Sequence, residues 1–96
     1  MLVLVTYDVS TVDGAGRRRL RRVARICVNY GQRVQNSVFQ CLVDPDQWVQ
    51  VRSKLLKVID PEEDSIRFYF LGRNWRRRLE SHGRQLAPEP DDPLIL

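Results

Sequence analysis

LVLVTYD, residues 2–8, is the stretch that decides the fold. Alternate residues of a strand point to opposite faces of its sheet, and here both sets are mainly apolar: Leu2, Leu4 and Thr6 against Val3, Val5 and Tyr7. Such a strand meets water on neither face and is typical of the centre of a sheet. Asp8 ends the strand, and ligand sites are commonly built at the rim of a sheet. Asp8 is therefore the first candidate functional residue.

Capping signals and apolar periodicity predict two helices. Asp13 can cap a helix that runs to about Tyr30 and is closed by Gly31, and its buried stripe is Leu20, Val23, Ala24 and Cys27. Asp44-Pro45 begins a second helix, because aspartate caps the free amides and proline at the first position loses no hydrogen bond. That helix ends at Asp60-Pro61 and buries Trp48, Val51, Leu55 and Val58.

Residues 32–43 are rich in strand-forming side chains, with Asn36-Ser37 as a tight turn between two strands, and residues 66–71 form a further strand that stops at Gly72. The element order is β-α-β-β-α-β, which predicts an α+β fold, a ferredoxin-like sandwich with both helices on one face of an antiparallel sheet. Two helices cannot cover all the apolar strand residues. We therefore expect a homodimer in which a second copy covers the other face.

The 96 residues suit a single domain, which we divide into a ferredoxin-like core, 1–72, and a C-terminal extension, 73–96. The extension contains a short candidate strand at 79–82 and ends in Leu94-Ile95-Leu96, an apolar tripeptide that needs a partner surface. We expect one or both segments to pack on the partner subunit as extra strands. No apolar run is long enough to span a membrane, which predicts a soluble, cytoplasmic protein with no membrane partner.

Arginine dominates the 16 basic residues, which face 12 acids for a net charge of +4, and three of the acids lie in the last eight residues. The planar guanidinium group suits phosphate oxygens, so nucleic acid is the expected partner. Arg18, Arg21, Arg22 and Arg25 project opposite the buried stripe of the first helix, whereas Arg17 lies at its border, close in sequence to Asp8. Arg76, Arg77 and Arg78 form a second basic cluster. Two such runs in one small domain favour a surface that follows a nucleic-acid backbone.

Between these runs, Arg33 is placed to contact a phosphate or carboxylate, and Phe39 fits the core better than a base-stacking platform. Cys27 and Cys41 fall at apolar positions and are expected to be core thiols rather than a disulfide or metal site. The acidic run 60–64 is expected to be a surface connection. His82 is the single histidine and lies in the extension, so a Ser/His/Asp triad at Ser10 is poorly supported.

Asp8 admits two interpretations. One carboxylate holds Mg²⁺ poorly, because this ion takes octahedral oxygen ligands, but a two-fold axis beside the strand would bring a second Asp8 to the same ion. The alternative is an acid that caps a turn or pairs with Arg17 or Arg33. Tyr7, its neighbour, fits the core better than a site, and Ser10 fits a turn.

Several segments together resemble the family of CRISPR-associated protein two across nearly the whole chain: residues 4–8, the arginine helix, GQRVQNSVF at 31–39, the strand from Asp64 to Gly72, and Asp92-Pro93-Leu94-Ile95. The pattern Arg33-x-Gln35-x-Ser37-x-Phe39 at this spacing from Tyr7-Asp8 makes the resemblance specific. It implies a ferredoxin-like homodimer whose Asp8 residues face each other across the two-fold axis. It also implies a role in spacer acquisition, as the dimer that bridges two dimers of the integrase, CRISPR-associated protein one.

The resemblance further implies a Mg²⁺-dependent endonuclease acting on single-stranded RNA or double-stranded DNA. By position, Asp8 would bind the metal and Tyr7 would neighbour it as part of the catalytic group, while Ser10, Arg17, Arg33 and Phe39 would line the cleft or position phosphate. Two readings stay open: an adaptor that binds duplex DNA, or a protein whose main task is phosphodiester hydrolysis in antiviral defence. A regulatory module that binds a small ligand at a dimer interface is disfavoured by the arginine surface.

Overall fold

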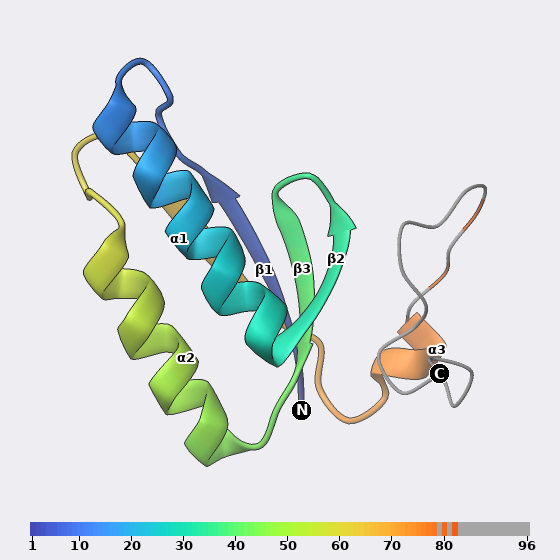
Figure 1. Cartoon of the computed structure of the whole chain (residues 1–96). Coiled ribbons are helices and arrows are strands. Elements are labelled where there is room, and N and C mark those ends of the chain that lie inside the picture. Colours follow the sequence, from blue (N-terminus) through green and yellow to red (C-terminus); the bar gives the residue numbers. More distant parts are fainter. Residues whose placement is uncertain (79, 81, 83–96) are drawn as a thin grey trace.

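The computed structural model describes residues 1–78, 80 and 82, and Figure 1 shows its layers. The chain forms β1 (Leu2–Asp8), α1 (Gly14–Tyr30), β2 (Gly31–Gln35), β3 (Val38–Leu42), α2 (Pro45–Val58), β4 (Ser65–Phe70) and a short helix, α3 (Trp75–Arg78). The four strands make one sheet in the order β2-β3-β1-β4, and each neighbouring pair is antiparallel. The predicted α+β sandwich and the central position of the first strand are confirmed.

Both long helices begin at the predicted caps. The Asp13 side chain accepts a hydrogen bond from Gly16 N at 2.8 Å, and Asp44 and Gln47 form a reciprocal capping box at the start of α2. Gly31 follows α1 directly, with an extended backbone rather than a left-handed one. Glycine is needed at this position because there is no room for a side chain: a Cβ there would lie 2.2 Å from the carbonyl oxygen of Gln40. Gly31 therefore lets β2 pair closely with β3 immediately after the helix.

α1 and α2 lie side by side over one face of the sheet (Figure 1). We call this the helix face. It buries Val3 and Val5 of β1 with Phe39 and Cys41 of β3, against Val23 and Cys27 of α1 and Val51 and Leu55 of α2. Trp48 of α2 makes edge contacts with the rings of Phe68 and Phe70, at 4.8 and 5.6 Å between centroids. The predicted apolar stripes of both helices therefore make the core.

Cys27 and Cys41 are both free and buried, as predicted. Burial raises the pKa of the Cys27 thiol to about 12 and that of the Cys41 thiol to about 11. Both thiols are therefore protonated at neutral pH and behave as small apolar side chains.

The sheet face opposite the helices, which we call the open face, carries the alternate residues of each strand. Leu4 and Thr6 of β1 and Val38 of β3 are half-buried there, and Tyr69 of β4 is 44% exposed. α1 and α2 do not cover this face, although Leu2 at one end of it has no exposed surface and Gln40 is buried. The chain thus presents a broad, partly apolar sheet surface of the kind that a second copy can cover.

After β4 the chain turns at Gly72, whose φ is 77°, and the predicted basic cluster at 76–78 forms part of the short helix α3. Trp75 is nearly buried, and the guanidinium carbon of Arg76 lies 5.3 Å from the centre of its ring. The candidate strand at 79–82 and the apolar end at 94–96 lie outside the described residues, so the packing of the extension on a partner stays a prediction. Among the described helices, none is long and apolar enough to cross a membrane.

Candidate carboxylate site and nucleic-acid interface

The end of β1, the turn between β2 and β3 and the start of α1 lie at one end of the sheet (Figure 1), and these segments carry several of the predicted site residues. Asp8 ends β1 there, opposite Ser65 at the start of β4. The turn between β2 and β3 lies beside them, because the backbone N–H of Tyr7 donates to the carbonyl oxygen of Ser37 at 3.1 Å. The loop from Asp8 leads into the first turn of α1 at the same end. We call this end of the molecule the β1 rim.

Asp8 and Tyr7 leave β1 on opposite faces. Asp8 is exposed on the open-face side, whereas Tyr7 is 5% exposed on the helix face, its ring 6.2 Å from that of Phe39. The Tyr7 hydroxyl donates to the carbonyl oxygen of Asn36 at 3.4 Å, and burial raises the pKa of the phenol. Within one chain, Tyr7 therefore packs in the core next to the β1 rim, as its core interpretation predicted. Its side chain does not share a surface with the Asp8 carboxylate.

Arg33 and Phe39 are paired across β2 and β3. The guanidinium carbon of exposed Arg33 lies 5.2 Å from the centre of the Phe39 ring, a cation–π contact. Phe39 has no exposed surface, so its ring is not open to a nucleotide in this structure. Phe39 instead supports Arg33 on one side and packs against Tyr7 on the other. The core interpretation of Phe39 is the one that this geometry favours, and Arg33 is the member of the pair that can reach a phosphate.

The first half of α1 presents its arginines away from the sheet. Arg18, Arg21 and Arg22 are exposed on the side opposite buried Val23 and Cys27. Arg17 is also exposed, and its guanidinium donates to the carbonyl oxygen of Thr11 at 3.5 Å. The predicted sharing of a site between Arg17 and Asp8 is not formed in the described residues. The arginine face and the Asp8 side chain lie instead on opposite sides of the sheet.

The second basic cluster lies far from the β1 rim. β4 starts beside Asp8 and ends beside Val3, and α3 follows that far end. Arg76 and Arg77 are exposed in α3, and Arg78 is its last residue. Arg76 and Arg77 therefore form a surface separate from the Asp8 carboxylate.

The donor set at the β1 rim bears on the predicted metal. Within the described residues there is no group of three or more His, Cys, Asp or Glu side chains that could hold a metal ion. Asp8 is an exposed oxygen ligand of the kind that Mg²⁺ prefers, but one chain supplies it alone. The residues of one chain thus fit at most half of the predicted magnesium site, and the second Asp8 carboxylate from another copy stays a prediction.

Asp64 organises the β1 rim, and this is the residue that sequence reasoning missed. Its Oδ1 accepts hydrogen bonds from Ser10 N at 3.1 Å and from Arg19 Nη2 at 3.2 Å. Its Oδ2 accepts from Arg19 Nε and from Asp60 N, both at 2.8 Å. The carboxylate has no exposed surface. One side chain therefore ties the loop after Asp8 to α1 and to the loop before β4.

Ser10 and Gly16 complete this junction. Ser10 contributes its backbone N–H to Asp64, which agrees with a turn residue and leaves its predicted catalytic role untested. A Cβ on Gly16 would lie 1.8 Å from the carbonyl oxygen of Ser10, so only glycine allows the helix to come this close. The acidic run 60–64 was expected to be a plain connection. Asp64 is one of four acids in this run, and nothing in the sequence singles out the one that pairs with Arg19.

Replacing Asp64 by asparagine should lower the free energy of unfolding at pH 7 by about 2 kcal/mol, because the carboxylate charge is lost while the Arg19 guanidinium group stays charged. The Arg19 hydrogen bond holds the pKa of Asp64 at about 2, below its unfolded value. A depressed folded-state pKa adds stability above the unfolded pKa, and this stability is lost as the pH falls through the folded pKa. The difference between parent and Asp64→Asn should therefore shrink between about pH 4 and pH 2.

Urea denaturation at pH 7, 4.5 and 3 measures this difference. Glu63→Gln is the matched control, since Glu63 is an exposed acid in the same loop, and its stability should follow the parent at each pH. An equal stability loss in Asp64→Asn at pH 7 and pH 3 would mean that the ion pair is not the cause.

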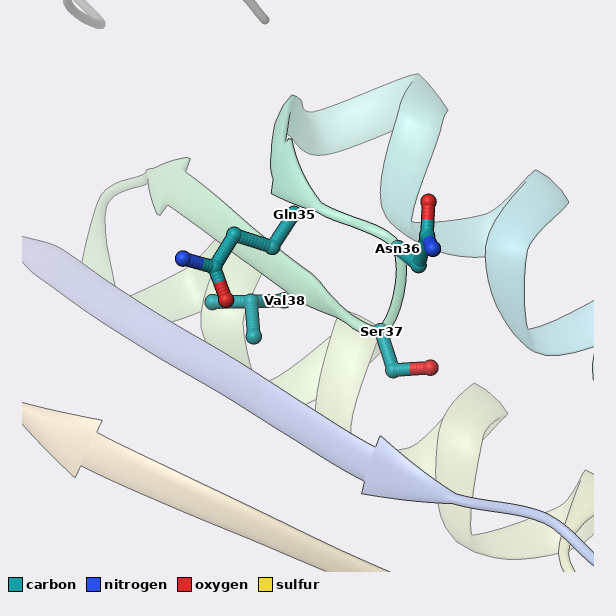
Figure 2. Close-up of a pocket in the computed structure, with 4 residues that line it drawn as sticks. All are labelled: Gln35, Asn36, Ser37 and Val38. Carbon is teal, nitrogen blue, oxygen red and sulfur yellow. The ribbon is translucent and has the colours of Figure 1, made fainter. Parts of the chain in front are cut away.

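A shallow hollow of about 490 Å³ lies at the turn between β2 and β3 and is lined by Gln35, Asn36, Ser37 and Val38. Figure 2 shows Gln35 and Val38 on one side of the turn, with Asn36 and Ser37 projecting from the turn itself. Three of these residues offer polar side chains close to the end of β1. Gln35, Asn36 and Ser37 lie in the segment 31–39. The sequence predicted only a turn at Asn36-Ser37 and no binding role, because polar residues are common in turns.

The comparisons with known proteins agree with one another. The profile of the family described as CRISPR associated protein Cas2 matches residues 1–79. A protein of Chlorobaculum tepidum named CRISPR-associated endoribonuclease Cas2 is 66% identical over all of both chains. A protein of Halalkalibacterium halodurans named CRISPR-associated endonuclease Cas2 is 50% identical over 99% of both.

The comparison of the fold with solved structures agrees with the sequence comparisons. The crystal structure of Streptococcus pyogenes Cas2 superposes with a TM-score of 0.76 at 60% identity, covering 86% of this chain and 100% of the other. The resemblance first drawn from Tyr7-Asp8 and the segment 31–39 is therefore confirmed by profile, relatives and fold together. This chain belongs to the CRISPR associated protein Cas2 family.

Proposed function

We propose that the chain acts as a homodimer that binds nucleic acid during CRISPR adaptation and bridges two dimers of the integrase, CRISPR-associated protein one. The observation that supports this is the separation of two surfaces: exposed arginines of α1 on one side of the molecule and the open sheet face on the other. Because the two surfaces do not overlap, a second copy can cover the sheet while the arginines stay in contact with a phosphate backbone.

The open face supports the homodimer part of the proposal. Tyr69 and Leu42, at 44% and 39% exposed, lie there beside half-buried Leu4 and Val38. Burying this surface in a second copy removes it from water, and a two-fold arrangement places the same patch on both sides. The C-terminal extension, 73–96, is proposed to add to the same interface.

We propose, as a second capability, hydrolysis of phosphodiester bonds in RNA or double-stranded DNA with Mg²⁺ held between two Asp8 carboxylates. Asp8 is exposed at the end of the central strand, and the relatives from Chlorobaculum tepidum and Halalkalibacterium halodurans carry nuclease names. When bound, Mg²⁺ would activate the attacking water and screen the charge that develops on the phosphate. Asp8 would hold the ion, whereas exposed Arg33, fixed over Phe39 on the helix face, would contact a phosphate away from the Asp8 carboxylate of the same chain.

The binding proposal is tested with Arg18→Gln/Arg22→Gln, which removes two charges from the α1 face without touching the core. Its dissociation constant for a duplex of about 30 base pairs should rise by about tenfold at 100 mM salt. Arg52→Gln/Lys57→Gln is the matched control, because it removes two exposed charges from α2. An equal loss in both double variants would show that net charge, and not the α1 face, governs binding.

A further inference from the structure

The charges on the open face are sparse. Across β1, β3 and β4 its positions carry one acid, Asp8, and one base, Arg67, and both are exposed. The other positions of these strands on that face are apolar or neutral: Leu2, Leu4, Thr6, Val38, Gln40, Leu42, Ser65 and Tyr69. Charged residues are depleted at the centre of interfaces, whereas arginine and tyrosine are enriched. An isolated acid and an isolated base are therefore unusual on a surface that a second copy is proposed to cover.

The two charges are neighbours. Asp8 is opposite Ser65 and Thr6 is opposite Arg67, so Asp8 and Arg67 are diagonal on adjacent strands. Diagonal positions of this kind are about 7–8 Å apart, within reach of an arginine side chain. Within the described residues neither side chain forms an ion pair, so both charges are available at this end of the sheet. Tyr69, two residues along the same strand, raises the pKa of Arg67 further, and an arginine is in any case charged at neutral pH.

A two-fold arrangement of two such faces creates an electrostatic problem. Any pairing that brings the β1 rims together brings two Asp8 carboxylates into one site, and like charges removed from water repel strongly. The same symmetry operation brings two Arg67 guanidinium groups to that site. The face therefore carries its own counter-charge in equal number, and it is self-complementary, which matches a second copy better than an unrelated partner.

We infer that Arg67 is the counter-charge of the Asp8 pair in the homodimer, reaching the partner's Asp8 and holding the two carboxylates together when no metal is bound. The inference rests on the homodimer of the proposed function. It assigns to Arg67 a positioning role: the guanidinium group sets the separation of the two Asp8 side chains rather than contacting a reacting phosphate.

The test is the dimer dissociation constant, measured by sedimentation equilibrium in EDTA at low salt. Arg67→Gln should raise it by about tenfold or more, because two carboxylates lose their counter-charge. Asp8→Asn should change it by less than about threefold, since the neutral amide removes the repulsion and still accepts a hydrogen bond from Arg67. The double variant Asp8→Asn/Arg67→Gln should return to within about threefold of the Asp8→Asn value, which shows that the two sites are coupled.

Arg52→Gln is the control for the loss of one arginine, since Arg52 is exposed on α2, on the other side of the sheet. If Arg67→Gln has the same dimer dissociation constant as the parent, the inference is overturned and the proposed function still stands. A defect of the double variant as large as that of Arg67→Gln would also overturn it, because Arg67 would then contribute packing alone. A parent protein that stays monomeric at all concentrations would overturn the homodimer itself.

Discussion

Asp8→Asn should lower Mg²⁺-dependent cleavage of RNA or duplex DNA by about 10³-fold, to the background of the assay. The side chain is exposed at the β1 rim, so the substitution removes a metal ligand without disturbing the core. Asparagine has the same shape but lacks the negative charge that Mg²⁺ prefers in a ligand. The variant should therefore keep the fold of the parent, its dimer and its affinity for the duplex while it loses hydrolysis.

Cleavage is measured on labelled RNA and duplex DNA with protein at saturating concentration, in Mg²⁺ and in EDTA. Glu63→Gln serves as the matched loss of an exposed acid and should cleave as the parent does. Cleavage by Asp8→Asn at the parental rate would assign the activity to a contaminant or to another part of the chain. It would leave the binding and bridging proposal intact, because that proposal does not use the carboxylate.

Duplex affinity should fall steeply with salt, on the order of 10³-fold between 50 and 200 mM if about six phosphates are contacted. Arginines supply this contact, and each neutralised phosphate releases counterions from the duplex. The exposed arginines of α1 are Arg17, Arg18, Arg21, Arg22 and Arg25, and a two-fold axis doubles their number. The dissociation constant is measured by fluorescence anisotropy at several salt concentrations and plotted on logarithmic axes.

The slope of this plot gives a second comparison. Arg18→Gln/Arg22→Gln should reduce the slope by about two for each copy that contacts the duplex, whereas Arg52→Gln/Lys57→Gln should leave it unchanged. Affinity that does not vary with salt would contradict an arginine surface that follows the backbone. In that case the arginines of α1 would serve solubility, as exposed basic residues often do.

The sequence predicted the elements well, because the signals that define them are local. Asp13 and Asp44 cap α1 and α2 in the structure, and Asn36-Ser37 is the turn between β2 and β3. The central position of β1 followed from apolar residues on both of its faces. The sequence did not predict the short helix that Trp75 to Arg78 form after Gly72, since four residues carry too little periodicity to be recognised as a helix.

The candidate site was predicted less completely. Asp8 and Arg33 stood out as candidates because an acid at a strand end and an arginine in a polar segment are visible in sequence, and their role in a site stays a prediction. Asp64 was not, because its partners Ser10, Arg19 and Asp60 meet it from three separate segments. The burial of Phe39 and Tyr7 on the helix face also separates them from the Asp8 carboxylate, although Tyr7 is its neighbour in the chain.

Periodicity, caps and motif spacing in the sequence are sufficient to predict the order of the elements up to β4, the sheet, the basic character of α1 and the family. The tertiary structure decided which side chains share a surface. Alternation along β1 sends Asp8 to the open face beside Arg67 and Tyr7 to the core, and the packing of α1 turns its arginines to the opposite side. Which charges meet depends on strand register and on the face that each residue occupies, and these arise when distant segments pair.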